Sequence, residues 1–70
     1  MPGFKVIDQS SITWYNEKEE IHREDGPAVE YTNGNKWWWL YDKQYTKKDY
    51  YKELVKRGLM TYENAVLEML

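Results

Sequence analysis

Cysteine is absent from this 70-residue sequence, which excludes disulfide bonds and thiolate metal sites. This composition suits a reducing cytosol better than a secreted setting, so we expect a cytoplasmic protein. The sequence also lacks any apolar run close to the roughly 20 residues that a membrane-spanning helix requires. Residues 1–8 have neither the basic nor the apolar region of a signal peptide. We therefore expect no association with a membrane.

An excess of positive charge is missing as well. Ten basic and twelve acidic side chains give a formal net charge of −2 and are mixed along the chain. Proteins that bind phosphate backbones without sequence preference depend on Lys and Arg to neutralise phosphates. Nucleic acid is therefore not the expected partner.

Histidine occurs once, at position 22, so no second histidine or cysteine can complete a zinc site or a nucleophilic triad. Glu24 and Asp25 follow closely and could orient His22 as a general base. A turn in which these side chains fix the backbone before Gly26 is the favoured interpretation, because a body of this size encloses only a small cleft. We expect no catalytic site, no cofactor and no metal.

Aromatic side chains, in contrast, are abundant. Four Trp, seven Tyr and one Phe make up 17% of a chain that lies near the lower size limit for a single apolar core. Large rings bury much area per residue, so they can replace the missing disulfide staples. Only one domain, residues 1–70, fits this length.

The first two thirds of the chain, residues 1–45, predict an antiparallel β-meander of four or five short strands. Asn33-Gly34 is typical of a two-residue β-hairpin loop with a type I′ turn. Such a loop would pair Val29 with Trp38 and Glu30 with Trp37. The predicted core side then carries Val29, Tyr31, Trp38 and Leu40, and the opposite side carries Ala28, Glu30, Trp37, Trp39 and Tyr41.

Residues 46–70 predict a helical pair packed across this sheet, which makes the fold class α+β. Thr46 is a candidate N-cap for a helix with an apolar stripe at Tyr50, Tyr51, Leu54 and Val55, and Gly58 ends it. Thr61 begins a second helix with apolar residues at helical spacing. Both helices are too short to be stable alone, so they must dock.

The three consecutive tryptophans at positions 37–39 cannot share one face of a strand, because neighbouring side chains alternate. The indoles on the face away from the core therefore need another surface to cover them, supplied by either the rest of this chain or another molecule. Trp and Tyr are the residue types that most often anchor protein interfaces. The predicted partner-binding residues are Trp37, Trp39, Tyr41, Tyr45 and Glu30.

The segment from His22 to Tyr31, with Asp25-Gly26-Pro27-Ala28 inside it and Asn33-Gly34 and Trp38-Trp39 after it, resembles the "HRxDGPA…Y…G…W" β-hairpin units of MORN-like small proteins of phages and bacteria. A weak repeat places Trp14 and Trp39 at equivalent positions. The resemblance implies a phage or prophage accessory protein that binds and inhibits a host protein complex, such as a defence system. Single-stranded nucleic-acid binding by aromatic stacking, and a structural role with self-association into a homodimer, are the alternatives.

Overall fold

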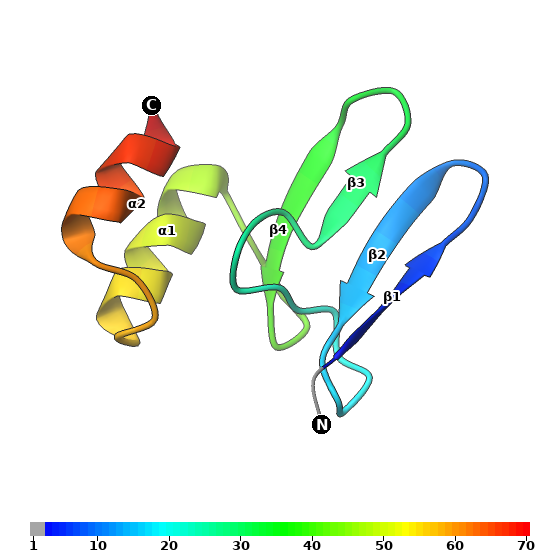
Figure 1. The fold of residues 1–70 in the computed structure, drawn as a ribbon, viewed down its shortest axis with the longest axis horizontal. Coiled ribbons are helices and arrows are strands. Elements are labelled where there is room, and N and C mark those ends of the chain that lie inside the picture. Colours follow the sequence, from blue (N-terminus) through cyan, green and yellow to red (C-terminus); the bar gives the residue numbers. More distant parts are fainter. Residues whose placement is uncertain (1–2) are drawn as a thin grey trace.

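The computed structural model describes residues 3–70. Five strands form one antiparallel sheet in the order of the sequence, and two helices follow, so the predicted α+β fold is confirmed (Figure 1). The elements are β1 (Phe4–Ile7), β2 (Ser11–Tyr15), β3 (Val29–Tyr31), β4 (Lys36–Leu40), β5 (Lys43–Tyr45), α1 (Lys47–Lys56) and α2 (Tyr62–Met69).

Both helices begin at the threonines that the sequence indicates. The Thr46 side chain accepts a hydrogen bond from the Asp49 backbone N–H at 3.1 Å, and the Thr61 side chain accepts one from Asn64 at 3.2 Å. Past the end of α1, Gly58 adopts a positive φ of 75°, which is typical of a residue that stops a helix.

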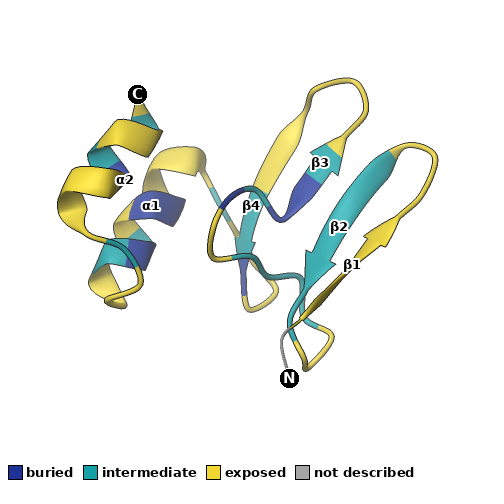
Figure 2. Ribbon diagram, in the orientation of Figure 1, coloured by how far each residue is buried: buried dark blue, intermediate teal, exposed yellow. Residues whose placement is uncertain are grey.

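The main core lies between the two helices and one end of the sheet. Its buried side chains are Leu40, Tyr50, Tyr51, Leu54 and Ala65, and Trp38 and Tyr45 pack against them. Among the described elements, α1 contacts β4 and β5, whereas α2 contacts α1 alone. The prediction that the helices pack across the sheet is therefore wrong. They lie at its β4–β5 end, as Figures 1 and 2 show.

The β3–β4 hairpin differs from its prediction by one residue of register. The Tyr31 N–H donates to the Asn35 carbonyl at 2.8 Å, and the Gly34 N–H donates to the Tyr31 carbonyl at 3.0 Å. These bonds close a three-residue loop, with Gly34 at a φ of 96°. Asn-Gly suits this three-residue loop as well as it suits a type I′ turn, because in this loop only the position of the glycine needs a positive φ. Val29 therefore pairs with Trp37, and Glu30 pairs with Lys36.

The type I′ geometry occurs instead at Tyr41-Asp42, whose φ angles are 50° and 65°. This two-residue turn joins Leu40 to Lys43, which pair across the β4–β5 hairpin. The Asp42 carboxylate accepts a hydrogen bond from the Ile21 N–H at 2.6 Å. A long-range contact thus holds a turn whose residues lack the usual Asn-Gly signal.

The corrected register changes the two faces of the sheet. Val29 and Tyr31 share a face with Trp37 and Trp39, so the prediction that they lie with Trp38 and Leu40 is wrong. Trp38 and Leu40 do face the helical core, as predicted. The registers also place Trp14 on the face of Glu30, opposite Trp39, so these two tryptophans are not equivalent.

The turn after β2 repeats the geometry of the β3–β4 loop with a different residue at its critical position. The Asn16 N–H donates to the Glu20 carbonyl at 2.9 Å, and the Glu19 N–H donates to the Asn16 carbonyl at 3.0 Å. Glu19 has a φ of 63°, which matches the role of Gly34. A side chain at such a φ carries a steric cost that glycine avoids.

Exchanging residues at these two turns is expected to have opposite effects. Glu19→Gly should raise the free energy of unfolding by up to about 1 kcal/mol, since relief of strain exceeds the entropy that glycine adds to the unfolded chain. Gly34→Ala should lower the free energy of unfolding by about 1 kcal/mol. Urea denaturation of both variants tests this. A loss of stability in Glu19→Gly would contradict the assigned turn.

Candidate interaction surface

One face of the sheet gathers uncharged side chains from every strand, and we call it the open face. Strand registers and the alternation of side chains place ten residues on it. They are Phe4, Val6, Ser11, Thr13, Tyr15, Val29, Tyr31, Trp37, Trp39 and Gln44. None of these residues carries a charge.

The helical core and the Arg23 side chain pack against the opposite face of the sheet. The helical core rests on Leu40 and on its neighbours Trp38 and Tyr45. The segment between β2 and β3 places the Arg23 guanidinium 4.1 Å from the centre of the Trp14 ring, and Arg23 Nη1 lies 3.1 Å from a Glu30 carboxylate oxygen. Trp14 and Glu30, the two residues that Arg23 contacts, both project from the face that the helices use.

The open face consequently exposes large apolar side chains. Phe4 is 46% exposed, Val6 48%, Tyr31 41% and Trp37 43%. Towards the middle of the sheet exposure falls, and Val29, which lies between Thr13 and Trp37 in the register, is buried. Several large apolar side chains exposed on one face mark an interaction site more often than isolated exposed residues do.

Contacts within the open face restrict its rings before any partner arrives. The Phe4 and Tyr15 rings stack with their centres 5.2 Å apart and an angle of 18° between their planes. Trp39 is half-buried, and its indole N–H is buried without a hydrogen-bond partner among residues 3–70. Restricted rings lose little conformational entropy on binding, which favours affinity.

The structure separates the residues that the sequence grouped as partner-binding. Trp37 and Trp39 lie together on the open face. Tyr41 is in the β4–β5 turn, where its ring centre lies 4.3 Å from that of His22. Tyr45 pairs with Trp38 and Glu30 pairs with Lys36, so both lie on the opposite face, and the prediction that Glu30 shares a face with Trp37 is wrong.

Four aromatic or aliphatic members of the open face that are exposed or half-buried were not predicted from the sequence as partner-binding residues. They are Phe4, Val6, Tyr15 and Tyr31. The alternation of Phe4 and Val6 around Lys5 was a usable signal for a strand with one apolar face. Tyr31 was assigned to the core because the predicted register was displaced by one residue.

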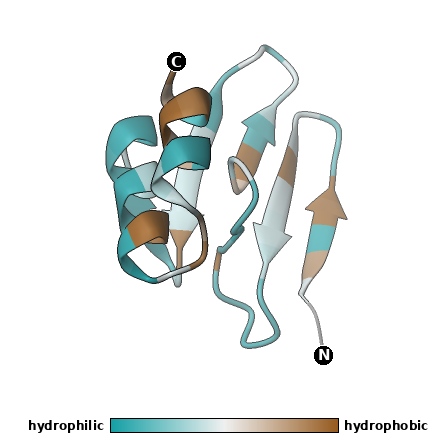
Figure 3. Ribbon diagram, turned by 60° about the vertical axis from the view of Figure 1, so that its left-hand side comes forward, coloured by the Kyte–Doolittle hydropathy of each residue, from teal (hydrophilic) through white to brown (hydrophobic). Residues whose placement is uncertain are grey.

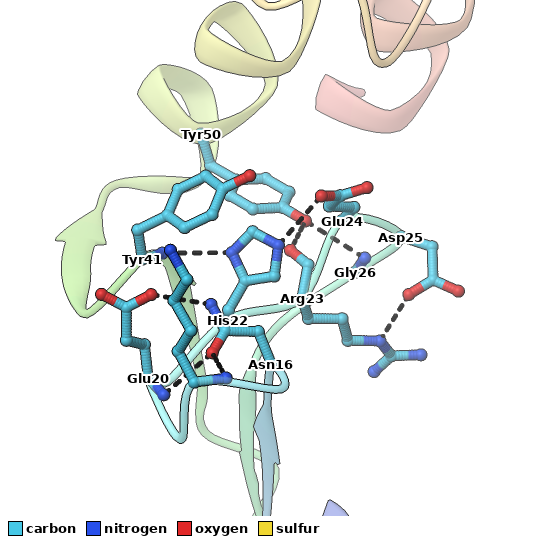
Figure 4. Close-up of polar contacts among 10 residues, drawn as sticks. Asn16, Glu20, His22, Arg23, Glu24, Asp25, Gly26, Tyr41 and Tyr50 are labelled. Atoms are coloured by element: carbon cyan, nitrogen blue, oxygen red, sulfur yellow. Dashed lines mark hydrogen bonds and ion pairs between the residues drawn. The ribbon is translucent and has the colours of Figure 1, made fainter. Parts of the chain in front are cut away.

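The His22 side chain joins the segment between β2 and β3 to the β4–β5 turn. Its Nδ1 accepts a hydrogen bond from the Tyr41 N–H at 3.1 Å, and its Nε2 lies 3.0 Å from a Glu24 carboxylate oxygen (Figure 4). This arrangement requires the tautomer with a proton on Nε2. Asp25 instead pairs with Arg23, at 2.8 Å. The three residues considered for catalysis therefore do not form one hydrogen-bonded group.

Replacing His22 is expected to loosen the β4–β5 turn. His22→Ala should lower the free energy of unfolding by about 1–3 kcal/mol, because the Tyr41 N–H loses its acceptor and the ring packing is lost. Glu24→Ala, which removes the more exposed partner, should change it by less than about 1 kcal/mol. Urea denaturation of both variants measures the difference. Equal effects would contradict this role for the His22 ring.

Within the described part of the chain, no helix is long and apolar enough to cross a membrane, and no group of three or more His, Cys, Asp or Glu residues could hold a metal ion. No protein-family model, curated protein or solved structure matches the chain.

Proposed function

We propose that this chain is a small, non-enzymatic protein-binding module that docks another protein on its open face. The observation that carries the proposal is the surface formed by Phe4, Val6, Tyr31 and Trp37, each more than 40% exposed and all on one side of the sheet. Leaving these side chains in water forgoes the free energy that their burial in an interface would provide. Trp and Tyr are also the usual anchors of such interfaces.

The chemistry of the open face favours an apolar protein surface as the partner. Lys5 and Lys36 alternate with open-face residues and lie on the opposite side, so no charge is present among the exposed rings. A nucleic-acid platform combines stacking rings with a positive groove that follows the phosphates. The open face has the rings without the groove, so we favour protein over single-stranded nucleic acid.

The resemblance to MORN-like small proteins of phages and bacteria supports a more specific proposal. We propose that the chain is a phage or prophage accessory protein and that its partner is a host protein complex, such as a defence system, which it inhibits. The small aromatic surface fits this role because it could cover a site on a larger protein without performing a reaction.

Capture from a bacterial host lysate tests the proposal, with the tagged protein compared with two variants. The Tyr31→Ala/Trp37→Ala double variant removes two exposed anchors from the open face. Tyr62→Ala removes an aromatic residue that is 70% exposed on α2, and it serves as the matched control. Circular dichroism verifies that each variant is folded.

We expect a protein that is captured by the wild type and by Tyr62→Ala but lost with the double variant. Capture that survives in the folded double variant would contradict the open face as the docking site. A labelled single-stranded oligonucleotide, titrated at low ionic strength, tests the alternative function. Tight binding that Trp37→Ala abolishes would favour nucleic acid over protein.

A further inference from the structure

The outer edge of β1 is the second unpartnered feature of the sheet. Among the described elements, β1 contacts β2 alone, and all four of its residues are exposed (Figure 2). The other edge strand, β5, has three residues and is in contact with α1. An exposed strand edge pairs readily with another strand, so natural proteins usually cover or interrupt it.

The backbone groups that point outward from β1 can be assigned from the neighbouring hydrogen bonds. The Trp14 N–H donates to the Ala28 carbonyl at 2.7 Å, and the Trp14 carbonyl accepts from the His22 N–H at 3.0 Å. Both groups of Trp14 therefore point away from β1, and its partner Lys5 makes no ladder bonds to β2. By alternation, the N–H and C=O groups of Lys5 and Ile7 face outward.

This pattern is symmetric about Val6, which lies midway between the two outward-facing residues. We propose that a second copy of this chain pairs its β1 antiparallel to this edge, around a two-fold axis at Val6. Lys5 then exchanges two backbone hydrogen bonds with Ile7 of the second copy, and Ile7 does the same with Lys5. A two-fold contact of this kind uses the same patch on both subunits and closes upon itself.

The side chains of β1 suit this pairing. Phe4, Val6 and Ile7 are apolar, and Figure 3 shows hydrophobic positions on both sides of a hydrophilic one along the strand. Ile7 is 64% exposed and would be flanked by the aliphatic part of Lys5 from the other copy. The Lys5 ammonium lies 5.0 Å from the centre of the Trp14 ring, over the sheet rather than beyond its edge.

The pairing joins two five-stranded sheets into one and makes their open faces continuous through Val6. Pairing at the edge leaves the open face uncovered, so the proposed dimer does not depend on the proposed function. Failure of the capture experiment would leave this dimer intact, and absence of the dimer would leave the open face of one copy available.

Single cysteines introduced into this cysteine-free chain test the proposal by disulfide crosslinking. In the proposed dimer the two Val6 residues form a non-hydrogen-bonded pair with Cα atoms about 4.5 Å apart, which suits a disulfide. The two Phe4 residues would lie about 14 Å apart, four strand positions from each other. Phe4→Cys is a matched control because Phe4 and Val6 are on the same strand and face, at 46% and 48% exposure. Tyr31→Cys, at 41%, reports on contact between open faces.

We expect Val6→Cys to crosslink at least about tenfold faster than either control under mild oxidation, because pairing raises its effective concentration. Adding Ile7→Pro to Val6→Cys removes an outward N–H without disturbing the β1–β2 ladder, so crosslinking should fall to the rate of the controls. Adding Ile7→Val instead keeps that N–H and should preserve the fast crosslinking of Val6→Cys. Equal rates at all three cysteines, fastest crosslinking at Tyr31→Cys, or no crosslinking at any position would overturn the proposal.

Discussion

Replacing Leu54 with Ala is expected to lower the free energy of unfolding by about 2–5 kcal/mol. The Leu54 side chain projects from α1 and is fully buried in the core that α1 forms with α2 and the sheet, so Ala leaves a cavity there. Domains are stabilised by roughly 0.05–0.15 kcal/mol per residue, so this single change could remove most of the stability of a chain this short. Thermal and urea denaturation followed by circular dichroism measure the loss.

Leu67→Ala provides the control for this prediction, because Leu67 lies on α2 and is 67% exposed. Its effect on the free energy of unfolding should stay within about 0.5 kcal/mol, as at other exposed positions. If Leu67→Ala cost as much as Leu54→Ala, the helical pair would not be docked as the structure places it.

Tyr50→Phe is expected to lower the free energy of unfolding by about 1–3 kcal/mol at neutral pH. The fully buried Tyr50 hydroxyl donates a hydrogen bond to the Arg23 carbonyl and accepts one from the Gly26 N–H at 3.3 Å. It thereby ties α1 to the segment between β2 and β3. Phe keeps the ring but leaves both backbone groups without this partner. Tyr62→Phe, the same change at an exposed tyrosine on α2, serves as the control and should leave the free energy of unfolding nearly unchanged.

The same hydroxyl predicts a loss of stability in alkali. Burial raises the pKa of Tyr50 well above the usual value of 10.0. The folded protein keeps this proton at a pH where the unfolded chain releases it, so the stabilising effect is complete below pH 10 and declines above it. Each pH unit above 10 should cost about 1.4 kcal/mol for this group. Burial also raises the pKa of Tyr51, which adds to the decline.

Urea denaturation between pH 8 and pH 11.5 tests this linkage. The wild type should lose stability steeply above pH 10, and Tyr50→Phe should show a shallower decline. Parallel curves for the two proteins would contradict the assignment of the alkaline loss to Tyr50.

The helices could be predicted from the sequence because their signals are local. Thr46 and Thr61 cap the first turns, and the apolar stripe of α1 supplies Tyr50, Tyr51 and Leu54 to the core. What the sequence did not indicate was where the helices dock. Their position at the β4–β5 end depends on contacts with Leu40 and Tyr45, which no local pattern specifies.

The register of the β3–β4 hairpin could not be decided from Asn33-Gly34 alone, because this pair fits both a two-residue and a three-residue loop. Trp37 and Trp39 remained together because their shared face depends only on alternation along one strand. The placement of Glu30 depended on pairing between strands, so the shift of one residue moved it to the opposite face. The sequence therefore placed Trp37 and Trp39 on one face correctly, whereas it assigned Tyr31 and Glu30 to the wrong faces.

The most direct test of the open face is an NMR titration of the isotope-labelled protein with the captured partner. The four tryptophans give four indole N–H signals, which report on both faces of the sheet. We expect the Trp37 indole signal and the backbone amides of β1, β3 and β4 to shift on binding, while the amides of α2 stay unchanged. Shifts confined to α2 or to residues 16–27, with the Trp37 signal unmoved, would show that the partner binds elsewhere and contradict the account.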